Sequence, residues 1–157
     1  FENPSNNIFL DSEEGCVPRK KIRIRNYPNS KDFNFYLEVK ISSAEGRFKK
    51  SYKINEKEYY RFIKLGYFDN LYGNCLPKVF VGYSRQYFSL LDCRITIDQS
   101  INYKKFNSNL NKIFDKMYVV EIKSNNMLLK GNLLNFFPFE RIRFSKYCRS
   151  FAYIPGI

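Results

Sequence analysis

The chain contains no histidine and no tryptophan among its 157 residues. The absence of histidine excludes Ser-His-Asp and Cys-His nucleophile schemes, histidine-ligated zinc and imidazole acid–base chemistry. Only seven glycines are present, and none of them forms GxxxxGKS/T or GxGxxG. A P-loop or a Rossmann phosphate cradle is therefore not expected.

Cysteines and long apolar runs are also scarce. Cys16, Cys75, Cys93 and Cys148 are widely separated, which argues against a four-cysteine zinc site and favours reduced thiols in a reducing compartment. No window approaches the ~18 consecutive apolar residues of a membrane span, and the start of the sequence has no signal-peptide pattern. We expect a cytoplasmic domain, or the cytosolic part of a larger membrane-associated protein, with no membrane contact from this segment.

Positive charge is the most informative feature that is present. Lysine and arginine total 27 against 15 aspartates and glutamates, which gives a formal net charge of +12. Such a surplus predicts a polyanionic partner, which could be nucleic acid, an anionic membrane or phosphate compounds. The aromatic content of 18% suits base stacking, but it equally suits a β-rich core.

Alternation and turn residues predict a mostly β chain with two or three helices. The expected strands cover 21–25, 33–41, 47–54, 78–86, 93–99, 117–123 and 142–144, and 78–86 and 93–99 should pair as a hairpin. The expected helices cover 56–65, 128–136 and 146–151, with Asn55 and Ser145 as N-caps and Gly66 as a stop. Residues 1–18 are expected to be irregular. We therefore predict a single α+β domain over 1–157.

The charged residues of the expected strands fall on one face. Residues two apart in a strand point the same way, so Arg23 and Arg25 oppose Ile22 and Ile24. The same parity groups Glu38 with Lys40, Tyr83 with Arg85, Arg94 with Thr96 and Asp98, Glu121 with Lys123, and Arg143 with Ser145. A half-exposed antiparallel sheet alternates in this way without any ligand. If the strands share a sheet, the face is a continuous basic surface, and in a closed barrel it would line the lumen.

Converging cations need compensation. Two like charges ~7 Å apart repel by roughly 2 kcal/mol at an effective dielectric constant of about 20. A bound polyanion would offset this repulsion, and so would the interspersed Glu38, Asp98 and Glu121. A carboxylate among cations can also hold Mg²⁺ or Mn²⁺ that bridges phosphate oxygens.

Several short segments together carry a family resemblance. They are Arg23-Ile-Arg25-Asn-Tyr27, Leu37-Glu-Val-Lys40, Phe48-Lys49, Pro77-Lys-Val-Phe-Val-Gly-Tyr83-Ser-Arg85, Arg94-Ile-Thr-Ile-Asp98, Val120-Glu121-Ile-Lys123 and Phe144-Ser145-Lys146-Tyr147. In this order they resemble the VTC domain, the catalytic domain of vacuolar transporter chaperone polyphosphate polymerases. That family belongs to the triphosphate tunnel metalloenzymes, and the resemblance spans nearly the whole chain.

The resemblance implies a mainly antiparallel β tunnel with a few flanking helices and a divalent metal, Mn²⁺ or Mg²⁺. It implies transfer of the ATP γ-phosphoryl group to a growing polyphosphate chain, with release of ADP. Glu121 corresponds to the metal carboxylate, Tyr83 to a contact with the nucleotide base, and Arg94 and Lys146 to catalytic positions. The implied phosphate-binding residues are Arg23, Arg25, Lys40, Lys49, Arg85, Arg94, Arg143, Ser145 and Lys146. Phosphoryl transfer needs positioning and charge neutralisation more than a covalent nucleophile, so the lack of histidine is no obstacle.

Three departures from the family pattern leave alternatives open. Arg143 stands where better-known members have lysine, and Ser51 where a second basic residue is often found. The first tunnel strand and its lysine would precede Phe1, so we expect an N-terminally truncated domain with an incomplete tunnel. Triphosphate hydrolysis is one alternative, since Leu37-Glu-Val-Lys40 resembles part of the Glu-x-Glu-x-Lys strand of other tunnel enzymes. A non-catalytic polyphosphate- or RNA-binding module is another, although no RNP-type motif supports specific nucleic-acid binding. Oligomeric state stays open.

One geometric prediction follows from strand parity and the family pattern together. Arg23, Arg25, Arg85 and Arg94 should point into one shared cavity rather than into solvent on separate faces. Scattered guanidinium groups would argue against the tunnel.

Overall fold

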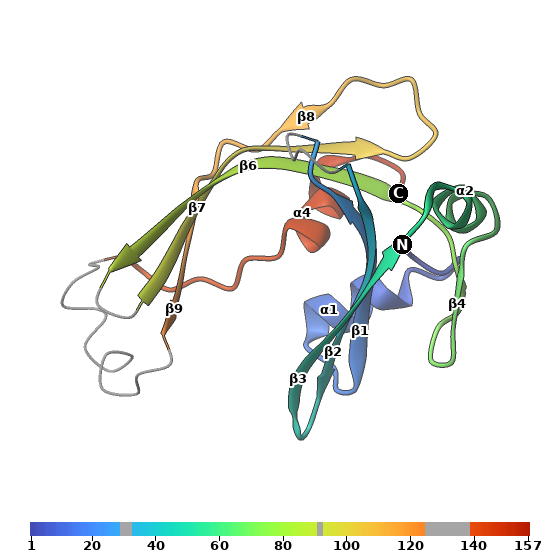
Figure 1. Cartoon of the computed structure of the whole chain (residues 1–157), viewed down its shortest axis with the longest axis horizontal. Helices are drawn as coiled ribbons and strands as arrows, with labels where there is room; N and C mark the ends of the chain where they lie inside the picture. Colours follow the sequence, from blue (N-terminus) through green and yellow to red (C-terminus); the bar gives the residue numbers. More distant parts are fainter. Residues whose placement is uncertain (29–32, 91–92, 125–138) are drawn as a thin grey trace. The chain divides into compact units, whose positions relative to one another are not determined.

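A computed structural model describes residues 1–28, 33–90, 93–124 and 139–157, and most of the regular structure in them is antiparallel β (Figure 1). The helices among these residues are short: α1 (Asn7–Glu14), α2 (Glu56–Leu65) and α4 (Lys146–Tyr153). The α+β class and the antiparallel pairing are therefore confirmed. The chain divides into two compact units, residues 1–79 and 80–157, and each is described by itself.

The first unit is built on the antiparallel sheet β1 (Arg19–Asn26), β2 (Phe35–Ser43) and β3 (Gly46–Ile54). All three strands were predicted to within a few residues. One face of the sheet is apolar, and Ile22, Leu37, Val39 and Ile54 on it are buried. Helix α1 packs against β1, and its Ile8 is fully buried. This packing leaves the opposite face of the sheet to the charged side chains.

Helix α1 corrects the prediction that residues 1–18 are irregular. Its N-cap Asn6 makes no side-chain capping bond. Instead the buried carboxylate of Glu2 accepts hydrogen bonds from the backbone N–H groups of Ile8 (3.0 Å) and Phe9 (2.8 Å). Unpaired N–H groups at a helix start need an acceptor, and here the acceptor comes from a residue that precedes the helix by five positions. A search for local capping residues therefore misses this helix.

Helix α2 agrees with its prediction at both ends. Asn55 accepts a hydrogen bond from Glu58 N at 2.9 Å, and Glu58 Oε2 accepts one from Asn55 N at 2.9 Å, which completes a capping box. Gly66 stops the helix with a φ of 84°. The short hairpin of β4 (Tyr67–Asp69) and β5 (Gly73–Cys75) follows and was not predicted, because three-residue strands carry too little alternation.

The second unit is a four-stranded sheet. The long strands β6 (Val79–Leu90) and β7 (Cys93–Lys105) are neighbours, as the predicted hairpin requires, and both extend beyond their expected ends. Strand β9 (Val119–Ser124) pairs antiparallel with one half of β7, and the unpredicted β8 (Ile113–Phe114) pairs with the other half. On β7 both faces are covered, because Ile95, Thr96 and Asp98 are all buried.

The C-terminal predictions met with different outcomes. The helix that Ser145 caps is confirmed as α4, since the Ser145 side chain accepts a hydrogen bond from Cys148 N. The expected strand at 142–144 is wrong, because these residues lead into α4 without pairing to a strand. The expected helix at 128–136 lies outside the described residues.

Three further observations concern the described residues of both units. None of the sheets formed by the described residues closes on itself, so the tunnel stays a prediction. All four cysteines are among the described residues, and none of them forms a disulfide. Within the described ranges, no helix has both the length and the apolar character that crossing a membrane requires.

Candidate functional site

The charged face of the β1–β2–β3 sheet gathers cations from all three strands. The pairing register places Lys21, Lys40 and Lys49 in one cross-strand row, and Arg23, Glu38 and Ser51 in the next. By the same register and parity, the positive residues of this face are Arg19, Lys21, Arg23, Arg25, Lys40, Arg47, Lys49 and Lys53. Among the residues of β1, β2 and β3, Glu38 is the single acidic residue on this face. The face is therefore strongly positive, as strand parity predicted.

Glu38 lies at the centre of this face and is 3% exposed. Its Oε2 accepts from Arg23 Nε at 2.7 Å and lies 2.5 Å from Arg23 Nη2. Its Oε1 lies 2.6 Å from Lys49 Nζ and 4.0 Å from Arg25 Nη1. Burial raises the pKa of this carboxyl, but hydrogen bonds from Lys49 and Arg23 outweigh burial and leave the pKa below its ordinary value. The group is therefore a buried anion that holds several cations together.

The second unit repeats this arrangement around Asp98, which is 1% exposed. Arg85 binds it side-on, with Nε 2.5 Å from Oδ1 and Nη2 2.7 Å from Oδ2, and Lys146 Nζ contacts Oδ2 as well. Burial raises the pKa of Asp98, and the hydrogen bonds from Arg85 and Lys146 lower it further than burial raises it. Strand β7 thus supplies the anion, while β6 and the first turn of α4 supply the cations.

The Tyr83 ring lies beside the cations Arg85 and Lys146. The Arg85 guanidinium lies 5.2 Å from the centre of the Tyr83 ring, and Lys146 Nζ lies 4.7 Å from it. Such cation–π contacts attract both cations to the face of the ring. Lys146 also begins helix α4, whose N-terminal backbone N–H groups add positive potential at this end. The predicted residues Tyr83, Arg85, Ser145 and Lys146 therefore come together.

Glu121 lies on β9 directly across from Thr96 on β7. Its Oε1 is 3.0 Å from Lys123 Nζ and its Oε2 is 3.9 Å from Arg85 Nη2, and the side chain is 43% exposed. The buried Thr96 hydroxyl has no hydrogen-bond partner among the described residues. Within those residues no three acidic or cysteine side chains cluster as a metal site. A half-exposed carboxylate still fits Mg²⁺ or Mn²⁺, since such ions often take one or two carboxylates together with water and substrate phosphates.

Arg94 and Arg143 are less closely tied to these clusters. Arg94 is exposed and lies across from Lys123, on the same sheet face as Asp98 and Glu121. Arg143 is exposed on the segment that was expected to be a strand, so no strand pairing sets its direction. Arg23 and Arg25 belong to the first unit, and Arg85 and Arg94 to the second. Their predicted shared cavity therefore stays a prediction.

Another buried carboxylate of the second unit, Asp115, was not predicted from the sequence. It accepts hydrogen bonds from Arg149 Nε at 2.7 Å, from the Tyr103 hydroxyl at 2.9 Å and from the Tyr153 hydroxyl at 3.2 Å. The hydrogen bond from Arg149 lowers the pKa of Asp115 to about 2 despite its burial. Asp115 follows a two-residue strand, and no periodic pattern marks it. The backbone N–H of Met117 also donates to Asp115 Oδ1, at 3.1 Å. Because the side-chain partners come from α4 and β7, the network ties these two elements together.

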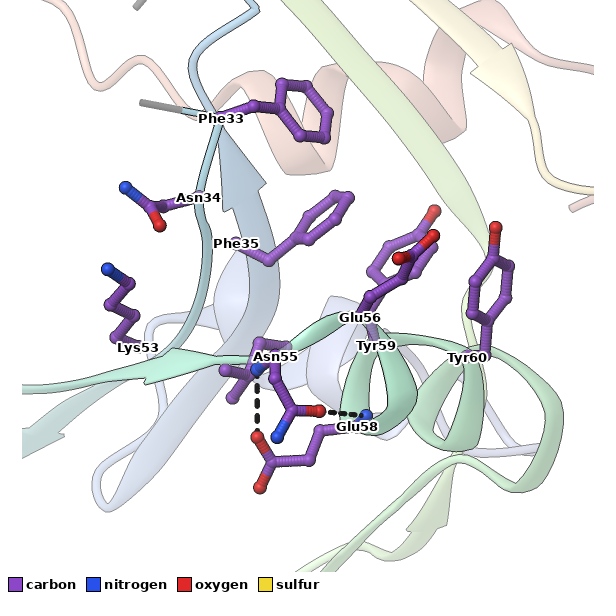
Figure 2. Close-up of a pocket in the computed structure, with 10 residues that line it drawn as sticks. Phe33, Asn34, Phe35, Lys53, Asn55, Glu56, Glu58, Tyr59 and Tyr60 are labelled. Atoms are coloured by element: carbon purple, nitrogen blue, oxygen red, sulfur yellow. Dashed lines mark hydrogen bonds between the residues drawn. The ribbon is translucent and has the colours of Figure 1, made fainter. Parts of the chain in front are cut away.

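The first unit also has a hollow of about 800 Å³ at the start of β2, the end of β3 and the start of α2. Figure 2 shows the rings of Phe33, Phe35, Tyr59 and Tyr60 around it. Phe35 and Tyr59 stack with ring centres 4.1 Å apart. The charged residues that line this hollow are Lys53, Glu56 and Glu58, so it lacks the positive excess of the neighbouring sheet face.

The molecule is thus an α+β protein whose two units each present cations around a buried carboxylate. A family model for the VTC domain matches residues 1–74 and 64–154. The chain therefore belongs to the VTC domain family, a polyphosphate-related family of triphosphate tunnel type whose members are generally enzymes. A search of curated proteins found no match.

Proposed function

We propose that this protein is a polyphosphate polymerase-like phosphotransferase, which moves the ATP γ-phosphoryl group onto a growing polyphosphate chain. The observation that carries the proposal is the pair of cation clusters around Glu38 and Asp98, built from residues that match the family's phosphate-binding pattern. Linear phosphates carry closely spaced negative charges, and arginine forks and lysine ammonium groups bind such oxygens well.

The proposed chemistry asks the protein to position and neutralise charge. A terminal phosphate oxygen of the acceptor attacks the γ-phosphorus, the bond from that phosphorus to the β–γ bridging oxygen breaks, and ADP leaves with that oxygen. Arg85, Arg94 and Lys146 bind the phosphoryl oxygens and stabilise the charge that spreads over them in the transition state. Tyr83 contacts the nucleotide base. No side chain becomes covalently modified, which agrees with the composition.

Glu121 would hold the divalent metal in this proposal. Mn²⁺ or Mg²⁺ held there would supply positive charge that offsets part of the negative charge of the phosphates. Lys123, whose Nζ lies 3.0 Å from Glu121 Oε1, is the ion-pair partner of that carboxylate when no metal is bound. Arg23, Arg25, Lys40 and Lys49 of the first unit would bind the polyphosphate chain.

The decisive experiment incubates the protein with ATP, Mn²⁺ and pyrophosphate, and follows ADP and chain length. Formation of ADP together with lengthening polyphosphate is expected. Lys146→Ala should abolish most of this turnover, whereas Lys112→Ala, which removes an equal charge from an exposed position in the same unit, should not. The absence of both nucleotide turnover and polyphosphate would overturn the proposal.

Two alternatives give different products. Hydrolysis of triphosphate would release orthophosphate without chain growth. A non-catalytic module would bind polyphosphate or RNA without turnover, and RNA binding would weaken log-linearly and steeply with salt. Neither alternative is favoured by a separate observation, so both serve as readable outcomes of the same assay.

A further inference from the structure

Both units contain a buried carboxylate bound by an arginine and a lysine. The family's set of phosphate-binding cations does not include this carboxylate. Each has one carboxylate on a central strand that is almost completely buried, Glu38 at 3% and Asp98 at 1% exposure. Each carboxylate binds one arginine through its Nε and Nη2 atoms and one lysine through its Nζ atom. The arginine and lysine are in both cases residues that match the phosphate-binding set.

We propose that Glu38 and Asp98 are positioning residues, which hold these cations in the arrangement that receives phosphate. The inference rests on the proposed function of the same site. In this proposal the carboxylates increase ligand affinity, in addition to offsetting the repulsion between neighbouring cations.

The hydrogen-bonding pattern of the arginines supports this role. Arg23 and Arg85 both turn the Nε–Nη2 edge of the guanidinium toward the carboxylate. Within the described residues, the hydrogen bonds and ion pairs of both arginines are made by Nε and Nη2, and none by Nη1. A guanidinium is planar, so fixing one edge fixes the direction of the remaining N–H donors. A carboxylate that binds Nε and Nη2 therefore decides where Nη1 points.

A carboxylate partner restricts a lysine side chain even more than an arginine side chain. A lysine ammonium on a four-carbon stem has much rotational freedom, which ligand binding would otherwise have to remove. Lys146 is held by Asp98 and by the Tyr83 ring and is 17% exposed. Lys49 is 47% exposed, yet its Nζ lies 2.6 Å from Glu38 Oε1. Since these contacts restrict the lysine side chains before phosphate arrives, less conformational entropy is lost on binding.

Removing the charge of a buried carboxylate should change phosphate affinity in opposite directions, depending on whether that carboxylate positions the cations or only offsets their charge. Asp98 with Arg85 and Lys146 carries a net charge of +1, and replacing Asp98 by asparagine would make it +2. By Coulomb's law alone the more positive cluster should attract phosphate more strongly. If the carboxylate positions the cations, the same replacement should weaken binding instead. The sign of the change separates the two roles.

The test measures binding of inorganic tripolyphosphate to the whole chain by calorimetry, with a chelator present so that metal plays no part. We expect Asp98→Asn and Glu38→Gln each to weaken binding by about tenfold, comparable to losing a group that orients a metal ligand. The matched controls are Glu140→Gln and Glu45→Gln, which remove one negative charge from exposed positions of the same units. The controls should leave affinity unchanged or raise it slightly.

A spectroscopic readout distinguishes positioning from general damage to the fold. In the wild-type protein the Arg85 Nε–H resonance should report an ordered side chain, and in Asp98→Asn its order parameter should fall while backbone resonances of β7 keep their positions. Unchanged or tighter tripolyphosphate binding by both variants would overturn the inference and leave the proposed function standing. Failure of the wild-type protein to bind tripolyphosphate would overturn both. If both variants are unfolded, the carboxylates belong to the fold and the inference is wrong.

Discussion

Asp115 shows at the residue scale how a buried carboxylate makes stability depend on pH. Its folded-state pKa is lowered to about 2, against about 3.9 for an unperturbed aspartate. A lowered folded pKa means that the stabilisation is present above the unfolded value and is lost as pH falls toward the folded value. We expect the second unit to lose about 2 kcal/mol of unfolding free energy between about pH 4 and pH 2.

Urea unfolding at a series of pH values measures this loss. In Asp115→Asn the pH dependence in that window should shrink, and the variant should be less stable at neutral pH because Arg149 loses its ionic partner. The control is Asp11→Asn, which removes one aspartate of the first unit and leaves the Asp115 network untouched. An unaltered pH profile in Asp115→Asn would contradict the assignment.

Glu121 is the residue at which metal binding and ion pairing can be separated. As the half-exposed partner of Lys123, it should contribute at most about 1 kcal/mol to stability. As a metal ligand it should matter for turnover. We expect Glu121→Gln to keep the stability of the wild type within that margin, to hold or raise tripolyphosphate affinity in metal-free buffer, and to lose Mn²⁺-dependent turnover.

Calorimetry with chelator, followed by an activity titration with Mn²⁺, checks this expectation. Metal-free affinity should not fall, because the substitution removes a negative charge from a basic surface. Mn²⁺-dependent activity equal to that of the wild type would remove Glu121 from the metal site and leave it as an ion-pair partner.

Helix α1 carries the prediction at the element scale. Its first turn depends on the Glu2 carboxylate, which accepts hydrogen bonds from two of its backbone N–H groups and from Asn3 N. Glu2→Ala should leave these buried donors without an acceptor and cost about 1–3 kcal/mol. Hydrogen exchange at Ile8 and Phe9 should accelerate, while exchange within α2 should stay unchanged. Glu13→Ala, at the other end of the same helix, is the matched control.

The elements that the sequence predicts well are those whose signals are local. Helix α2 has its cap, capping-box partner and stop within twelve residues, and β1 to β3 have clean alternation. The misses share a different cause. Helix α1 is capped by Glu2 from outside, β4 and β5 are too short to show a period, and 142–144 alternates without finding a partner strand. Local patterns describe what a segment can do, whereas pairing partners decide what it does.

Some features of the candidate site could be predicted from local sequence patterns, and others could not. Strand parity correctly placed Arg23, Arg25 and Lys40 on one sheet face, and Arg94, Asp98 and Glu121 on another. Parity could not reveal that Glu38 and Asp98 would be the buried centres, because burial depends on which side chains fold over a strand. Lys146 reaches Asp98 from 48 residues away, and no spacing rule predicts such a contact.

At the scale of the whole molecule, the prediction still to be tested is that both clusters serve one ligand. Arg94 is the probe, because it is exposed on β7 and should contribute to phosphate binding more than to folding. Arg94→Ala removes one of several like charges, so stability without ligand should hold or rise slightly, while tripolyphosphate affinity should fall about tenfold, the loss expected for one charged hydrogen bond. Arg23→Ala should weaken the same binding event.

In a shared cavity the wild-type chain binds one tripolyphosphate, and both variants lower the affinity of that single step. With separate sites, calorimetry would show two binding steps, and each variant would weaken only one of them. Lys64→Ala, an exposed charge on α2, is the control for net charge. Two independent steps, or an Arg94→Ala variant that unfolds in phosphate-free buffer, would contradict the shared cavity or the role of Arg94 respectively.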